Sequence, residues 1–310
     1  MNFSKPEIEK FAGTEKFQRY SKAFLVIFFL IAAVFGNLSA QEQAGDNFWA
    51  VPADGEEAGA EGTVFYSFFV NVVSEPFAFP LIGLVNVARG DHRPLQLGLV
   101  NLNTGNFSGL QTGLANIARS FNGAQIGLVN IATRGSRGLQ LGLVNYVDSM
   151  ESGLPIGLIS VVRQGGYRVV EFGFSDFFHF SMGLKLGVER FYTTIFAAYN
   201  SVDEFAIEHF GTGLGFGSIF NITRLFFFNP ELNNFAVLAS DANRQFLSFV
   251  SYFGFNLGQN FSIAFGPSAT WIWNWDDVEP PSPLFTVAEY TINNTNSIVI
   301  GARAALRFHF

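Results

Sequence analysis

Cysteine is missing from the 310-residue chain, and charged residues make up only 14% of it. The first absence excludes disulfides, thiolate metal sites and a lipid-modified N-terminal cysteine. The second, together with 39 phenylalanines, argues against a soluble globular domain, which could not bury so much apolar surface. No stretch after residue 40 has the long uninterrupted apolar run of a membrane helix. Apolar residues instead alternate with small or polar ones, which is typical of strands that contact lipid on one side.

The first 40 residues have the features of a secretion signal. Basic residues precede an apolar run at 23–36, which is too short to span a bilayer comfortably, and small residues follow up to Ala40. We predict a signal peptide over 1–40, and an uncleaved anchor is the alternative. The next segment, 41–61, contains six acidic residues and no basic one, which predicts an acidic linker. Cleavage would remove five basic and three acidic residues and change the net charge from −7 to −9, which argues against nucleic acid as a partner.

The segment 80–162 is a tandem repeat with a period of about 15 residues. Each copy has a central glycine, and eleven of the twelve residues that flank these glycines are Leu or Ile. Glutamine usually precedes the glycine by two residues, and asparagine usually follows it by three, as in "LQLGLVN" at 95–101 and 139–145. Turn-forming residues separate the copies. The repeat glycines are Gly83, Gly98, Gly113, Gly127, Gly142 and Gly157.

The repeat permits two structures. As barrel strands of about ten residues with tight turns, the copies would direct their Leu/Ile face to lipid and their Gln–Gly–Val face inward. Asparagine would then share the leucine face, which fits a barrel poorly. As a parallel β-solenoid, the copies would instead stack their asparagines into an internal ladder over a leucine core.

After Phe172 the repeat fades, but the alternation continues to the C-terminus. In the last stretch, "SIVIGARAALRFHF", one face is apolar and the other carries charge. We expect Arg303, Arg307 and His309 to line a lumen, where the arginines would either favour anions or pair with carboxylates such as Glu171 or Glu208. Aromatic residues expected at the membrane interface are Trp271, Trp273, Trp275, Phe308 and Phe310.

Together these patterns predict an all-β protein. We expect a transmembrane antiparallel β-barrel over 62–310 with roughly 14–18 strands, the first half of it built from the 15-residue repeats. The alternative is that the repeat segment forms a β-solenoid.

The C-terminal pattern that ends in Phe310 resembles the signature of bacterial outer-membrane β-barrel proteins. This resemblance implies an outer-membrane location after Sec-type secretion, with lipid as the surrounding medium and the barrel-assembly machinery as a partner during insertion. The tandem unit around "GLQLGLVN" resembles surface-repeat proteins known mainly from spirochaetes. That resemblance implies an envelope or surface location and no defined activity.

Few residues could carry catalysis. The four histidines belong to no metal-binding or hydrolase motif, and the sequence predicts no catalytic residue, metal site or cofactor. Two main function classes remain: a passive, porin-like pore, and a structural or surface-interaction repeat protein. An outer-membrane lipid hydrolase that pairs His209 with a serine is a third and weaker hypothesis.

Overall fold

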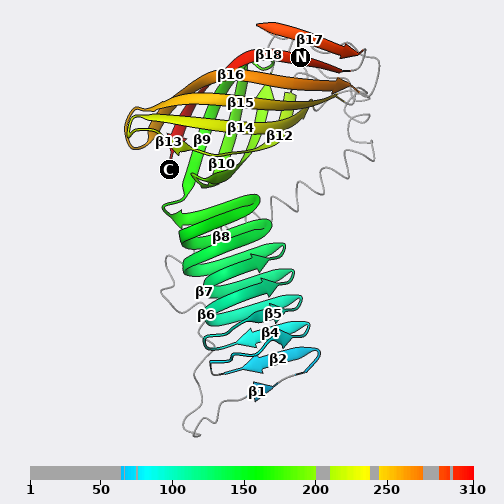
Figure 1. Ribbon diagram of the computed structural model, residues 1–310, viewed down its shortest axis with the longest axis vertical. Helices are drawn as coiled ribbons and strands as arrows, with labels where there is room; N and C mark the ends of the chain where they lie inside the picture. The colour runs from blue at the N-terminus through cyan, green and yellow to red at the C-terminus, as the bar shows by residue number, and fades with distance from the viewer. Residues whose placement is uncertain are drawn as a thin grey trace, which may run out of the picture. The chain divides into compact units, whose positions relative to one another are not determined.

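The computed structural model describes residues 64–65, 67–74, 76–199, 210–237, 244–274, 286–293 and 296–310. The predicted signal peptide, the acidic linker and Trp275 lie outside these residues. Within the described ranges the secondary structure consists of strands, and no helix is long and apolar enough to cross a membrane. The all-β prediction is confirmed. The chain first forms a stack of parallel coils and then an antiparallel barrel (Figure 1).

The described residues of these two parts contain eighteen strands. The coils contain β1 (Val64–Phe65), β2 (Val70–Val73), β3 (Leu81–Ile82), β4 (Val85–Ala88), β5 (Leu95–Leu97), β6 (Val100–Thr112), β7 (Ala115–Ile126) and β8 (Val129–Gln164). The barrel region contains β9 (Tyr167–Ser175), β10 (Phe180–Val188), β11 (Phe191–Tyr199), β12 (Phe210–Gly217), β13 (Phe220–Asn221), β14 (Phe226–Val237), β15 (Arg244–Asn256), β16 (Phe261–Asn274), β17 (Ala288–Asn293) and β18 (Asn296–His309).

The repeat forms a β-solenoid. Each coil pairs in parallel with the next at an offset of one repeat, so that Val85 pairs with Val100 and Val100 with Ala115. The expectation that the repeats are barrel strands is therefore wrong, and the solenoid alternative is confirmed. The alternation of side chains could not distinguish barrel strands from solenoid coils, because both structures alternate with a period of two and both need a tight turn after each strand.

Amide ladders hold the coils together. Asn86 Nδ2 donates to Asn101 Oδ1 at 2.8 Å, and Asn101 Nδ2 donates to Asn116 Oδ1 at 2.8 Å. A parallel glutamine ladder includes the bond from Gln125 Nε2 to Gln111 Oε1 at 2.7 Å. All of these side chains are fully buried, so the ladders satisfy polar groups that would otherwise be costly inside the coil.

The leucines do not form the core that the solenoid alternative expected. Leu97 and Leu99 are 43% and 49% exposed, whereas Gln96 and Asn101 on either side of them are buried. The chain turns a corner at Gly98, and this corner breaks the alternation, so Gln96 and Asn101 both point inward while the two leucines between them point outward. The apolar core instead lies at the other end of each coil. It consists of Phe107, Ala118, Phe121, Ala132, Val147 and Val162.

The C-terminal half closes into an antiparallel barrel of eight strands. Neighbours follow the chain order β9, β10, β11, β12, β14, β15, β16 and β18, and β18 pairs with β9 to complete the ring. The short strands β13 and β17 pair at its edges. The barrel therefore has fewer strands than the 14–18 expected, because the repeat segments form the solenoid and not part of the barrel.

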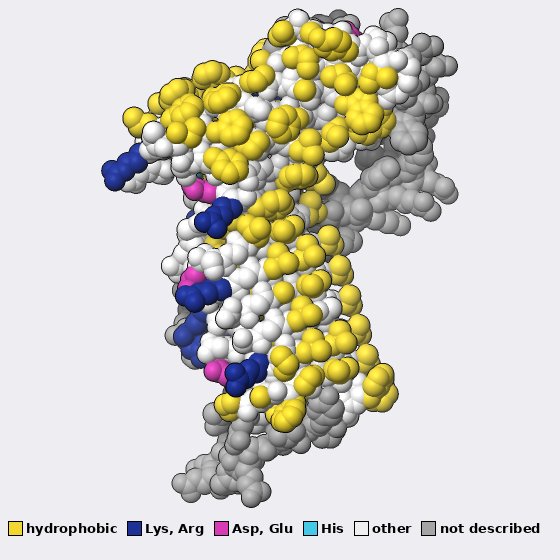
Figure 2. Space-filling view, in the orientation of Figure 1, with side chains coloured by type: hydrophobic (Ala, Val, Ile, Leu, Met, Phe, Trp, Pro, Cys, Tyr) yellow, Lys and Arg dark blue, Asp and Glu magenta, His cyan; other side chains and the backbone are white. Residues whose placement is uncertain are grey.

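Side chains alternate strictly between the two sides of the barrel wall. On β15, Phe249 and Phe253 are exposed on the outer surface, while Ser248, Val250 and Tyr252 are buried inside. The same holds for other strands, so the outer wall is covered by apolar side chains (Figure 2). Connections are shorter on average at one end, where they are 189–190, 218–225 and 257–260, than at the other end, where they are 176–179, 200–209, 238–243 and 275–287.

Candidate functional site in the barrel lumen

A cluster of four charges occupies the lumen. Arg307 on β18 contacts Glu171 on β9, with 2.6 Å between Nε and Oε2, and its Nη2 lies 3.2 Å from Glu231 Oε1 on β14. Lys185 on β10 contacts the same two carboxylates, with 2.9 Å between Nζ and Glu171 Oε2. Two cations and two anions therefore neutralise one another across four strands.

Polar and aromatic side chains surround this cluster. The Tyr192 hydroxyl donates to Glu231 Oε1 at 2.5 Å, and Asn229 Nδ2 donates to that hydroxyl at 2.6 Å. The guanidinium carbon of Arg307 lies 4.9 Å from the centre of the Tyr252 ring. Buried charges are tolerated when pairing and hydrogen bonds replace water, and here several partners share each charge.

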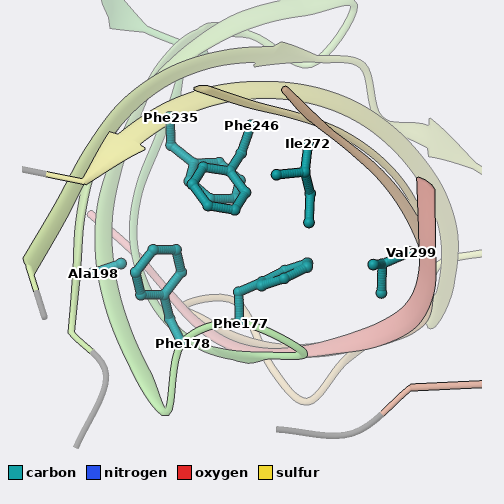
Figure 3. Packing of buried hydrophobic residues seen from close by; sticks show 7 residues of the cluster. All are labelled: Phe177, Phe178, Ala198, Phe235, Phe246, Ile272 and Val299. Carbon is teal, nitrogen blue, oxygen red and sulfur yellow. The ribbon is translucent and has the colours of Figure 1, made fainter. Parts of the chain in front are cut away.

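Aromatic packing fills the lumen towards the end with the long connections. The β9–β10 turn folds inward and places Phe177 and Phe178 inside the ring of strands, against Phe235 and Phe246 (Figure 3). The Phe235 and Phe246 rings stack with centroids 4.7 Å apart. Ser175 Oγ accepts hydrogen bonds from the amides of Phe177 and Phe178, which holds the turn in this position.

A second buried ion pair lies beside the inward turn. Asp176 accepts a 2.9 Å hydrogen bond from Ser268 Oγ and lies 4.0 Å from Arg303 Nε. The neighbouring Gly301 leaves space for it, since a Cβ there would be 2.3 Å from Asp176 Oδ2. The turn is therefore attached to the wall by charge as well as by aromatic contacts.

The space left in the lumen is small. A cavity of about 30 Å³ lies between Glu171, Phe178, Thr194, Glu231 and Arg303. The described side chains of the charge cluster and of the inward turn thus occupy much of the lumen.

The structure places the three predicted lumen residues differently from one another. Arg307 is fully buried in the centre of the cluster, and its partner Glu171 is one of the two carboxylates considered in the sequence. Glu208, the other one, lies outside the described residues, as does His209. Arg303 is close to Asp176. His309 lies at the rim, with Nε2 3.1 Å from Ser262 Oγ and its ring against Tyr167.

The predicted interface aromatics lie on the outside of the wall where they are described. Trp271 is 45% exposed and its ring contacts that of Trp273 at 5.2 Å. Phe308 and Phe310 are exposed at the short-connection end, and Arg168 lies over the Phe310 ring. Trp271 and Phe308 thus mark the two ends of the barrel wall.

Sequence reasoning missed Lys185, Glu231 and the inward turn. Lys185 alternates with outward Leu184 and Leu186, and Glu231 lies between Asn229 and Asn233 on one strand face. That alternation could have assigned both charges to the lumen. Their mutual contact could not be found without the strand order, because 46 residues separate them.

No family model, no curated protein and no solved structure matches this chain. Its function must therefore be inferred from its own wall, lumen and repeats.

Proposed function

We propose that the chain is a bacterial outer-membrane protein whose barrel is a closed anchor and whose repeat solenoid is a structural or interaction module. One observation carries this proposal: the barrel is apolar outside and charged inside, which is the reverse of a soluble protein. Strands such as β15 and β16, with 13 and 14 residues, are long enough to cross the apolar band when tilted. The expected signal peptide and the C-terminal aromatic pattern agree with this location.

The filled lumen favours an anchor over a pore. A passive pore needs a continuous aqueous path, whereas the neutral charge cluster and Phe177 with Phe178 occupy the interior. A closed interior contributes stability without transport. We therefore rank the structural or interaction role above the pore, and the hydrolase third.

Barrel topology suggests on which side of the membrane the solenoid lies. Bacterial barrels have short turns on the periplasmic side and longer loops outside. The solenoid joins β9 through Gly165 and Gly166 at the end with the short connections, where β18 also ends. We therefore place the solenoid on the periplasmic side of the outer membrane.

Two measurements on the full chain test these points. Protein extracted from outer membranes should migrate differently on gels before and after boiling, and it should give no steady conductance in planar bilayers. An unchanged migration would contradict the membrane barrel, and stable channels would contradict the closed anchor.

The side of the membrane can be tested with a thiol, since the chain has no cysteine. A single cysteine at the exposed Arg119 of the solenoid should resist an impermeant maleimide on intact cells and react once the outer membrane is permeabilised. Equal labelling before permeabilisation would instead place the solenoid on the cell surface.

A further inference from the structure

The outside of the solenoid carries an extended aliphatic surface. Eleven side chains with exposures between 37% and 53% form rows along the glycine corner and beside it (Figure 2). We call this set the aliphatic face. It consists of Ile82, Leu84, Leu97, Leu99, Val100, Leu110, Leu114, Ile126, Leu128, Leu141 and Leu143.

The interior behind the aliphatic face is polar. The asparagine and glutamine ladders lie directly inside the glycine corner, so each coil buries amides and exposes leucines at the same place. An isolated solenoid in water would gain from the opposite arrangement. The exposed rows therefore indicate an apolar environment on this side of the coil.

The opposite corner of the coils is charged. Arg89, Arg119 and Arg134 are exposed there, and Arg137 forms a 2.5 Å ion pair with Glu151 of the next coil. Each coil thus has one aliphatic and one charged end. A structure with one apolar side and one charged side binds at a membrane surface with its apolar side inserted, as amphipathic helices do.

Contacts with the barrel show which corner of the last coil lies further from the short β10–β11 turn, and so deeper in the proposed membrane. Near the charged corner, Val162 belongs to the cluster that packs against Val188, the last residue of β10 before the short turn. At the glycine corner, Thr193 Oγ1 donates to the carbonyl oxygen of Gly157 at 2.6 Å. Thr193 pairs with Leu186, so this contact lies two residues further along the wall, away from the turn.

The same contact lies on the outer surface of the barrel. Tyr192 and Thr194 point into the lumen and are buried there, so Thr193 between them points outward. Leu186 also faces outward, yet it is only 4% exposed because the last coil covers it. The glycine corner therefore meets the wall on the side that the proposed function assigns to lipid.

We propose that the aliphatic face binds the acyl chains of the membrane leaflet around the barrel, so that the solenoid is inserted sideways with its charged corner in water. This inference rests on the proposed membrane location of the barrel. The rows continue in the first coil with the exposed Phe68, Phe69 and Val70. The position of the glycine corner favours lipid over a second copy of the chain, because the last coil contacts the outer barrel wall through Thr193 and Gly157, on the side that the proposed function assigns to lipid.

Single-cysteine labelling of the full chain tests the proposal. A polarity-sensitive fluorophore is attached at Leu114→Cys or Leu128→Cys on the aliphatic face, at Arg119→Cys on the charged corner, and at Phe249→Cys on the outer barrel wall. Each variant is reconstituted into phospholipid vesicles, and heat-modifiable migration confirms that it has folded. Quenching by brominated acyl chains and by aqueous iodide is then compared. We expect the labels at 114 and 128 to be quenched by the brominated chains nearly as strongly as the label at 249, and several-fold more than the label at 119.

Each other result identifies which idea fails. If iodide quenches the labels at 114 and 128 while the label at 249 remains in lipid, the aliphatic face is exposed to water and the inference is overturned, but the membrane barrel stands. If the labels at 114 and 128 resist both quenchers and self-quench as the protein density rises, a second copy of the chain covers the aliphatic face and the inference is again wrong. If iodide also quenches the label at 249, the proposed function fails together with the inference.

Discussion

Gly98 lies so close to the preceding coil that an added Cβ would be 2.3 Å from the carbonyl oxygen of Gly83. The same relationship recurs between Gly113 and Gly98 and between Gly127 and Gly113. Backbone hydrogen bonds fix this spacing, since the amide of Gly98 donates to the carbonyl oxygen of Thr112 in the following coil. The glycine of each repeat is therefore required by the stacking distance at the corner.

Replacing Gly98 with alanine should destabilise the solenoid by about 1–3 kcal/mol, because the neighbouring backbone cannot move without breaking the stack. Unfolding by urea in detergent micelles, followed by circular dichroism, measures the change. Gly135→Ala is the matched control. Its Cβ would meet only the ends of the Ser149 and Glu151 side chains, at 3.1 and 3.3 Å. An equal loss in both variants would contradict the steric explanation.

The asparagine ladder makes a second prediction. Asn101→Ala removes the Oδ1 acceptor of Asn86 Nδ2 and the donor to Asn116 Oδ1, and it removes one of the two donors to the carbonyl oxygen of Thr112. A buried polar group without a partner costs about 1–3 kcal/mol, so we expect a loss of this size or more in the urea experiment. Ser160→Ala at the last rung removes only the 3.2 Å bond from Asn145 and should cost less. Equal losses of stability in the two variants would show that a residue bonded on both sides within the ladder contributes no more than a residue at its end.

The sequence contained enough information for the period of the repeat and for the Asn ladder, because both follow from the spacing of like residues. It did not determine whether the repeats pair in parallel or antiparallel, since alternation has the same period in both. The burial of Asn101 on the opposite side from Leu97 and Leu99 depends on the corner at Gly98, which breaks the alternation. A local pattern could not show that break.

The barrel site shows a similar limit. Alternation on the last strand suggested the inward side for Arg307 and allowed Glu171 as its partner. Four strands contribute to the cluster, so its other members, Lys185 and Glu231, depend on strand order and register. These are properties of the closed ring. The predicted number of strands is too high because no residue pattern marks where the solenoid ends and the barrel begins.

The charge cluster should not tolerate the loss of one carboxylate. Glu231→Gln would leave Lys185 and Arg307 sharing Glu171 alone, and breaking a buried ion pair typically costs about 3–5 kcal/mol. We expect the folded gel band to disappear at a clearly lower temperature than in the parent protein. Combining this change with Lys185→Met restores charge balance and should recover much of the loss. A double variant as unstable as the single one would indicate that packing, rather than charge, is decisive.

His92 should make the solenoid sensitive to mild acid. Its ring is buried between Phe77 and Phe107, with centroids 6.0 and 5.8 Å away, and Nε2 lies 2.9 Å from the carbonyl oxygen of Phe79. Burial lowers the pKa of His92 below its ordinary value of 6.5, and the bond to Phe79 opposes this only in part. Below pH 6.5 the unfolded chain therefore takes up a proton more readily than the folded one.

Stability should accordingly fall as the pH drops below about 6.5, by at most about 1.4 kcal/mol per pH unit, and level off below the folded pKa. His92→Phe continues the aromatic column without a titratable group and should remove this part of the acid sensitivity. Urea unfolding at a series of pH values compares it with His179→Gln, which leaves His92 in place. If both variants keep the acid sensitivity of the parent protein, His92 is not its source, and a titrating group elsewhere in the chain must be responsible.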